Sequence, residues 1–223
     1  MKVLVVGATG GSGRAAVAQL LAQGHEVTAF CRAHNAGFQP SPRLTCVSGD
    51  ATDAASVEHA VMGQDAVVVT LGITENPFRV RLWGPARTPL DVRSRGTRNV
   101  IAAMRRHGVR KLVVQTSYGV GATRELLGTL DRLFFELVLK PQIADTELQD
   151  HEVSQSDLDW VLVQPVHLTD EEHGEMPFVS PRGETAQMKV SRRSVGRLLA
   201  RAVDDPSLVR TSLSVSGARA ASA

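Results

Sequence analysis

Short apolar runs alternate with longer amphipathic segments along this chain. Residues 3–6 (Val-Leu-Val-Val) form a continuous apolar run closed by Gly7, which is typical of a strand buried on both faces. A helical pattern follows from Ser12 to about Leu21, and Gly24 provides its C-terminal stop. The same rhythm predicts strands at Glu26–Phe30, Leu44–Val47, Asp65–Leu71, Lys111–Gln115, Trp160–Gln164 and Leu213–Val215. It predicts helices at about Asp53–Val61, 93–107, 123–139 and 142–155, and a last helix capped by Ser191.

This alternation predicts an α/β fold. Strands separated by helices of about ten residues or more favour right-handed crossovers, and therefore a parallel sheet with helices on both faces. We expect a doubly wound, mostly parallel sheet in a single domain over residues 1–223. Substrate-side insertions are expected at about 74–95 and 120–142, and Pro141 is expected to separate two helices.

Composition narrows the class of protein. The 223 residues are 43% apolar and 22% charged, which is ordinary for a folded domain, and the net charge is only +2. We therefore expect no nucleic-acid partner, and no membrane span because no apolar run approaches about 18 residues. Cys31 and Cys46 lie in apolar segments, so we predict buried, reduced thiols and a cytoplasmic protein. The pattern does not distinguish a monomer from a homo-oligomer.

A glycine-rich loop joins the first strand to the first helix, with the sequence Gly7-Ala8-Thr9-Gly10-Gly11-Ser12-Gly13. Glycines allow a tight turn and a close backbone approach to a pyrophosphate, and the helix start offers unpaired N–H groups and a positive dipole end. Thr9 and Ser12 add hydroxyl groups. Because the loop occupies the first strand-to-helix junction, it predicts a dinucleotide-binding site, with a ligand-free tight turn as the alternative.

The end of the second strand indicates which dinucleotide is bound. An NAD site usually places an acidic residue there, about 20 residues past the glycines, to accept hydrogen bonds from the ribose. This chain has Arg32 instead, and a guanidinium binds a 2′-phosphate that a carboxylate would repel. Arg14 and His34 stand close enough in sequence to assist. We therefore predict NADP(H) as the cofactor; the alternative for Arg32 is a solvated loop charge.

Two later strands supply further cofactor contacts in this interpretation. Asp50 and Ala51 follow the third strand, where the carboxylate can accept a hydrogen bond from the adenine amino group. Leu71 and Gly72 close the fourth strand, where a small residue lets the backbone lie against the cofactor. Both pairs fall at strand C-terminal ends, the edge at which open α/β sheets bind ligands.

Taken together, these motifs resemble the atypical short-chain dehydrogenase/reductase family. Within it, the chain is similar to the NmrA-like NAD(P)H-binding proteins and to the flavin reductase/biliverdin reductase B group. The resemblance covers about residues 2–217 and implies a Rossmann-like fold that binds NAD(P). It rests on Gly7-Ala8-Thr9-Gly10-x-x-Gly13, Arg32, Gly49-Asp50, Gly96-Thr97-Arg98-Asn99, Gly108-Val109, Thr116-Ser117 and Ser191-Arg192-x-x-Val195-Gly196.

The resemblance also implies residues for the nicotinamide end of the site. In the Thr116-Ser117 motif, Ser117 matches a serine beside the nicotinamide, and Pro165-x-His167 matches a Pro-x-His stretch that lines the same end. Ser117 follows the fifth strand and His167 the sixth, so both are expected above the cofactor crevice. Ser117, Tyr118 and His167 are our candidate catalytic residues. The alternatives are a Ser117 hydroxyl that satisfies local backbone and a structural loop histidine at His167.

One feature of most enzymes in this superfamily is missing. They reduce carbonyls with a tyrosine whose pKa is lowered by a lysine four residues later. The only tyrosine here is Tyr118, and Ala122 stands four residues after it. One remaining class is an NADPH-dependent reductase whose conjugated acceptor (a flavin, quinone or tetrapyrrole) needs no positioned acid, because the charge is delocalised. The other is a non-catalytic NADP(H)-binding sensor or regulator.

Three further segments allow more than one interpretation. The connection at 74–95 carries five arginines with Phe78 and Trp83, which suits a planar anionic acceptor or, equally, a solvated basic loop. The apolar pattern at 126–138 is typical of a lid, an oligomer face or core packing. The acidic run at 170–175 is interpreted as a solvated loop, so we expect no metal.

Overall fold

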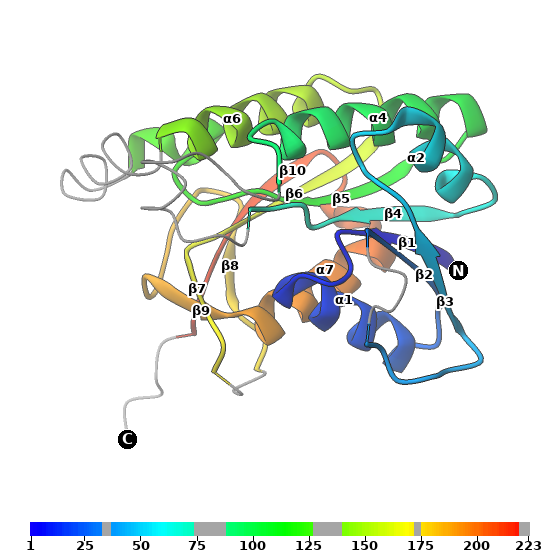
Figure 1. The fold of residues 1–223 in the computed structure, drawn as a ribbon. Helices are drawn as coiled ribbons and strands as arrows, with labels where there is room; N and C mark the ends of the chain where they lie inside the picture. Colours follow the sequence, from blue (N-terminus) through cyan, green and yellow to red (C-terminus); the bar gives the residue numbers. More distant parts are fainter. Residues whose placement is uncertain (33–36, 74–87, 127–139, 172–174, 219–223) are drawn as a thin grey trace.

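An eight-stranded sheet runs through the centre of the molecule (Figure 1). The computed structural model describes residues 1–32, 37–73, 88–126, 140–171 and 175–218. The strand order is β3-β2-β1-β4-β5-β6-β10-β8, with all neighbours parallel except β10 and β8. The strands are β1 (Lys2–Val6), β2 (Glu26–Cys31), β3 (Leu44–Ser48), β4 (Ala66–Val69), β5 (Lys111–Gln115), β6 (Asp159–Pro165), β8 (Phe178–Ser180) and β10 (Thr211–Ser216). A separate parallel pair is formed by β7 (His167–Thr169) and β9 (Lys189–Ser191).

Helices cover both faces of this sheet (Figure 1). One face carries α1 (Gly11–Ala22) and α7 (Arg192–Asp204). The opposite face carries α2 (Ala54–Val61), α4 (Val92–His107) and α6 (Lys140–Ser154). Two short 3₁₀ turns, η1 (Gly121–Leu126) and η3 (Pro206–Leu208), lie in connections. This is the doubly wound α/β arrangement that the sequence predicts.

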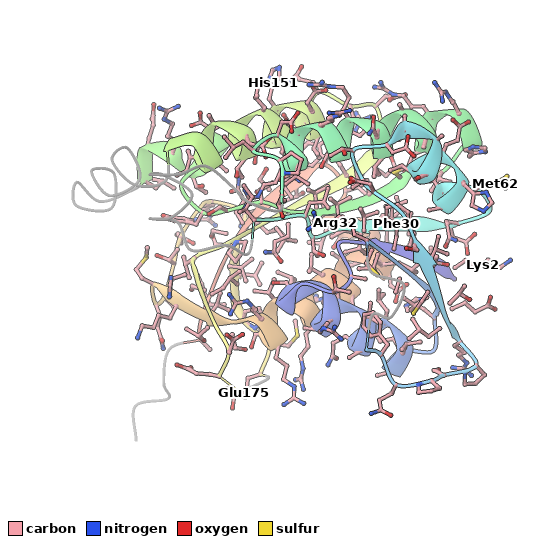
Figure 2. The ribbon with its side chains drawn as sticks, viewed as in Figure 1. Lys2, Phe30, Arg32, Met62, His151 and Glu175 are labelled. Carbon is pink, nitrogen blue, oxygen red and sulfur yellow. The ribbon has the colours of Figure 1, made fainter. Side chains whose placement is uncertain are left out.

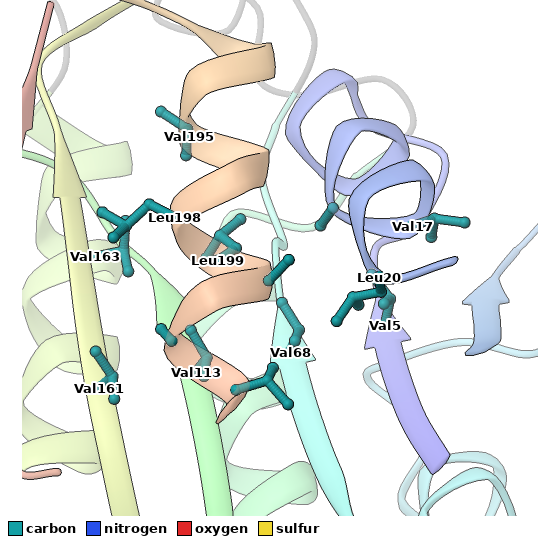
Figure 3. Close-up of a cluster of buried hydrophobic side chains, with 14 of the residues drawn as sticks. Val5, Val17, Leu20, Val68, Val113, Val161, Val163, Val195, Leu198 and Leu199 are labelled. Atoms are coloured by element: carbon teal, nitrogen blue, oxygen red, sulfur yellow. The ribbon is translucent and has the colours of Figure 1, made fainter. Parts of the chain in front are cut away.

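Successive residues of the central strands point alternately to the two layers of helices. Val3 and Val5 of β1 join the core beneath α1 and α7, whereas Leu4 and Val6 join the core on the side of α2, α4 and α6. Strands β4, β5 and β6 divide their residues in the same way. Figure 3 shows the first of these cores, where Leu198 and Leu199 of α7 face the strand valines. Burial on both sides explains why these strands are continuous apolar runs.

Most predicted elements are confirmed to within two residues. The Ser191 cap is also confirmed, because its Oγ accepts the Ser194 N–H at 3.0 Å. The helix that we expect to begin after Pro141 instead includes this residue, since α6 spans Lys140–Ser154. Residues 127–139 of the preceding predicted helix, and 74–87 of the first predicted insertion, lie outside the described residues. The three-residue strands β7, β8 and β9 were not predicted, because so short a run carries no readable periodicity.

The prediction for one cysteine is wrong. Cys31 is buried, but Cys46 is exposed. Its strand, β3, lies at one edge of the sheet, so its residues are less covered than those of central strands. In the described part of the chain, no helix is both long enough and apolar enough to cross a bilayer.

The contact between α1 and α7 provides a test of this packing. A Cβ on Gly196 would lie 2.5 Å from the Cβ of Ala15 and 2.6 Å from its carbonyl carbon. We expect Gly196→Val to lower the free energy of unfolding by about 1–3 kcal/mol, since neither helix can yield its backbone cheaply. A thermal melt measures this as a Tm drop of several degrees, at about 2–4 °C for each kcal/mol.

Arg201→Ala on the exposed side of α7 is the control. Its ion pair with Asp205 is an exposed i,i+4 pair, so the substitution should change stability by less than about 0.5 kcal/mol. An unchanged Tm in Gly196→Val would contradict the tight approach of the two helices.

Candidate functional site

The glycine loop turns sharply at the end of β1. Gly7 has φ +83°, and a Cβ there would lie 2.9 Å from the Thr70 carbonyl oxygen. The Gly10 N–H donates to the Gly7 carbonyl at 3.1 Å, and a Cβ on Gly13 would collide with that same carbonyl. The absence of side chains at Gly7 and Gly13 therefore brings the start of α1 directly against the end of β1.

The start of α1 carries no side-chain cap. Gly10 occupies the N-cap position, and no acidic residue lies in the first turn. The first N–H groups of the helix are therefore left to other acceptors, and the helix dipole adds partial positive charge at the same point. This end of α1 is chemically suited to a phosphate group.

A cleft of about 700 Å³ opens at this edge of the sheet. It begins beside β2, passes over the glycine loop and reaches the ends of β4 and β5. Its lining includes these predicted site residues: Gly7, Thr9, Gly10, Gly11, Ser12, Arg32, Asp50, Ala51, Leu71, Gly72 and Thr116. It also includes residues that were not predicted as site residues, among them Thr70, Thr88, Arg93, Gln115, Leu168, Asp170 and Arg192.

Arg32 lies at the β2 end of the cleft, beside Phe30 (Figure 2). Its guanidinium is exposed, and Nη2 donates to the Thr88 hydroxyl at 3.1 Å. Thr88 is itself buried, so it is a fixed partner for a surface side chain. Arg14 does not line the cleft, and its side chain donates to the Thr9 and Gly37 carbonyls. His34 lies outside the described residues.

The walls of the cleft near β3 and β4 are held by α4. Gly96 has no side chain, which lets Leu71 and Ala51 pack directly against the helix. The Asn99 side chain donates to the Ala51 carbonyl at 2.9 Å. Asp50 accepts from both the backbone N–H and the hydroxyl of Thr52 at 2.8 Å, which orients its carboxylate.

A buried carboxylate from α6 caps the start of α4. Asp145 accepts from the backbone N–H groups of Arg93 and Ser94 at 3.0 and 3.1 Å, and from the Ser94 hydroxyl. Arg93 itself lines the cleft, and its Nη2 lies near Gly72. Burial lowers the pKa of this guanidinium, and the negative charge of Asp145 opposes the shift. Helix α4 therefore places a half-buried cation beside the end of β4.

The end of β5 contributes a side-chain acceptor. The Oε1 atom of Gln115 is buried and has no hydrogen-bond partner within the part of the chain that the structure describes. Thr116, the next residue, also lines the cleft, whereas Ser117 does not. The Ser117 hydroxyl donates to the Tyr118 carbonyl at 3.2 Å.

The other candidates for the nicotinamide end lie around the cleft rather than in its lining. Tyr118 is buried in the core beneath α7, and its hydroxyl donates to the Gly183 carbonyl at 3.2 Å. His167 is exposed, and the neighbouring Leu168 lines the cleft instead, because successive residues of β7 point to opposite faces. Gly13 and Pro165 also lie outside the lining.

Arg192, the first residue of α7, contacts the glycine loop. The side chain of Arg192 occupies the space that a Cβ on Gly11 would need. Its Nη1 forms an ion pair with Asp170 at 2.7 Å. The sequence provides only a weak indication that Arg192 contacts the glycine loop, because Arg192 stands there only as part of the motif before the last helix.

Asp150 of α6 lies behind the ends of β5 and β6. Burial raises the pKa of this carboxyl, and a hydrogen bond from the Gln164 side chain at 2.9 Å opposes the shift. Among the described residues, no three His, Cys, Asp or Glu side chains are grouped to hold a metal ion.

Known proteins resemble this chain in sequence and in fold. A 2-alkyl-3-oxoalkanoate reductase from Stenotrophomonas maltophilia is 37% identical over 120 residues, which cover 54% of this chain and 34% of the relative. The match thus spans about a third of that longer protein. A Rossmann-fold NAD(P)-binding family protein from Shigella flexneri is 25% identical, with a TM-score of 0.71 over 100% of this chain and 96% of the other.

A further solved structure, ChuY, is described as an anaerobillin reductase from Escherichia coli O157:H7. It aligns over 100% of both chains with a TM-score of 0.79 and 20% identity, so the likeness shows the fold alone. The profile of the NAD(P)H-binding family matches residues 7–206, which include the glycine loop, Arg32 and the strand ends that form the cleft. The chain therefore belongs to the NAD(P)H-binding family and has a Rossmann fold.

Proposed function

We propose that the protein is an NADPH-dependent reductase that passes hydride to a conjugated acceptor, such as a flavin, a quinone or a tetrapyrrole. The observation that carries this proposal is the chemistry of the cleft lining, whose described residues include no tyrosine and no lysine. The hydroxyl of Tyr118, the only tyrosine of the chain, is bound to the Gly183 carbonyl. A conjugated acceptor spreads the developing charge and can take its proton from solvent, so it needs no such pair.

The donor groups of the cleft fit NADP(H). The uncapped start of α1 and the glycine loop offer backbone N–H groups to a pyrophosphate. Arg32 offers a guanidinium to a 2′-phosphate at the end of β2, the position where an NAD site usually has an acidic residue. When bound, NADPH supplies the hydride from its nicotinamide ring.

The remaining lining residues position the two ends of the cofactor. Asp50, held by Thr52, is suited to accept from the adenine amino group. Gln115 Oε1, buried and without a described partner, is suited to accept from a carboxamide or ribose donor at the nicotinamide end. Leu71 and Gly72 supply the backbone surface between these two groups.

Ser117 and His167 remain our proposed acceptor-side residues, and Tyr118, whose hydroxyl donates to the Gly183 carbonyl, stays in the proposal only as the neighbour of Ser117. Ser117 directly follows the lining residue Thr116, and His167 directly precedes the lining residue Leu168. The names of the oxoalkanoate reductase and the anaerobillin reductase both describe reduction, which supports the reaction type. The two names describe different substrates and therefore leave the acceptor of this chain to experiment.

Replacement of Arg32 tests the choice of cofactor. We expect Arg32→Ala to weaken NADPH binding by about 1.5–3 kcal/mol, because a charge-assisted hydrogen bond to the 2′-phosphate is lost. This corresponds to roughly a 10- to 150-fold rise in Kd, measured by calorimetric titration. NADH binding should stay nearly unchanged, because NADH carries no 2′-phosphate.

Two further variants sharpen this test. Thr88→Val removes the acceptor that orients Arg32, so NADPH binding should weaken by a smaller amount, about 0.5–1.5 kcal/mol. Arg43→Ala replaces an exposed arginine just before β3, away from the cleft, and should leave both cofactors unaffected. Equal losses of NADPH and NADH affinity in Arg32→Ala would rule out the 2′-phosphate assignment.

An anaerobic stopped-flow experiment tests the reaction. Protein loaded with NADPH is mixed with FMN, riboflavin, a quinone or biliverdin, and oxidation is followed at the nicotinamide absorbance band. We expect rapid oxidation by at least one acceptor, slowed about tenfold or more by Ser117→Ala or His167→Ala if these residues orient the acceptor. His151→Ala, on the outer surface of α6 (Figure 2), is the matched control and should react at the unchanged rate.

The alternative function, a non-catalytic NADP(H) sensor, gives a different outcome. Tight NADPH binding with no oxidation by any of the four acceptors would favour the sensor over the reductase. Normal oxidation rates in both Ser117→Ala and His167→Ala would instead support the reductase function and show that these two residues do not orient the acceptor.

A further inference from the structure

One cation of the cleft is not used by the proposed cofactor site. Arg93, near the start of α4, lines the cleft beside the end of β4, where a Cβ on Gly72 would lie 3.5 Å from its Nη2. Its Nη1 atom is buried and has no hydrogen-bond acceptor among the residues that the structure describes. A buried donor of this kind costs free energy until an acceptor reaches it.

The nearby carboxylate of Asp145 is not a hydrogen-bond acceptor for the Nη1 atom of Arg93. Asp145 is the acidic group whose charge acts on Arg93, but its oxygens accept from the backbone N–H groups of Arg93 and Ser94 and from the Ser94 hydroxyl. In the described ranges, no ion pair joins the side chains of Arg93 and Asp145. The guanidinium keeps its positive charge, as arginine does throughout proteins, and it faces the cleft.

Strand order places Arg93 beyond the phosphate-binding half of the cleft. Neighbouring strands lie about 4.8 Å apart, and the sequence of strand ends is β2, β1, β4, β5. Arg32 stands at the end of β2 and the glycine loop at the end of β1, so these two positions account for the 2′-phosphate and the pyrophosphate. The nicotinamide half, which carries no anionic group, is then left for the ends of β4 and β5.

We propose that Arg93 binds an anionic group, a carboxylate or a phosphate, on the acceptor itself. This inference rests on the proposed reductase function and narrows its substrate class to anionic conjugated molecules. A guanidinium suits this role because it forms two parallel hydrogen bonds to a carboxylate or phosphate, and partial burial strengthens them. Gly72 leaves room for such a group, since it presents no side chain toward Arg93.

Matched acceptors that differ only in charge test the inference. Protein saturated with NADP⁺ is titrated with FMN against riboflavin, and with biliverdin against its dimethyl ester. We expect the anionic member of at least one pair to bind about tenfold or more tightly than its neutral twin. The pair that shows the preference identifies the anion as a phosphate or a carboxylate.

In Arg93→Met the preference should fall to within about twofold, and Arg93→Lys, which keeps the charge, should retain part of it.

Arg95→Met provides the control, because Arg95 is exposed on the same helix and does not line the cleft. It should preserve both the anion preference and the NADP⁺ affinity. Absence of any anion preference in the unchanged protein, or its persistence in Arg93→Met, would overturn the inference. A loss of NADP⁺ affinity of tenfold or more in Arg93→Met would also overturn it, by making Arg93 a cofactor residue. Failure of the unchanged protein to bind NADP⁺ would instead count against the proposed function as a whole.

Discussion

The whole binding edge depends on one backbone contact, the approach of the Gly7 carbonyl to Gly13. Any side chain at Gly13 would collide with that carbonyl, so α1 starts against β1 only when glycine stands there. The position of α1 in turn sets the position of α7, which packs on it through Gly196. Helix α7 then places its first residue, Arg192, against the glycine loop. A clash at Gly13 would therefore disturb both helices on this face as well as the loop.

Two buried carboxylates of α6 support the cleft from behind in different ways. Asp145 caps α4 from outside that helix, and the residue at the N-cap position of α4, Asp91, makes no side-chain cap bond. Asp150 lies in surroundings that favour its neutral form, because burial raises its pKa. The folded state thus holds this proton to a higher pH than the unfolded chain does. Its contribution to stability is present at acidic pH and is lost as the pH rises through the folded pKa.

The sequence was most informative where function depends on neighbours along the chain. The glycine loop, Arg32 and the Asp50 position all follow strand ends directly, so an alternating pattern is enough to bring them to one edge. Gln115 gave no such signal, because its importance lies in the hydrogen-bond partner that its Oε1 lacks among the described residues. The sequence did include Arg93 among the five arginines of the 74–95 connection, but only the fold distinguishes it from the other four. Periodicity also does not specify which face of a three-residue strand turns inward. The sequence therefore suggested His167, which is exposed, whereas the adjacent Leu168 lines the cleft.

The hydrogen bond between Arg32 and Thr88 has a thermodynamic consequence for the segment that enters α4. Thr88 is buried, and its hydroxyl accepts from the same guanidinium that is proposed to hold a phosphate. Any ligand that stabilises this orientation of Arg32 therefore favours the docked position of Thr88, and docking of Thr88 must favour that ligand by the same factor. If Arg32 binds the 2′-phosphate as proposed, cofactor binding at the end of β2 and the burial of Thr88 ahead of α4 would favour one another.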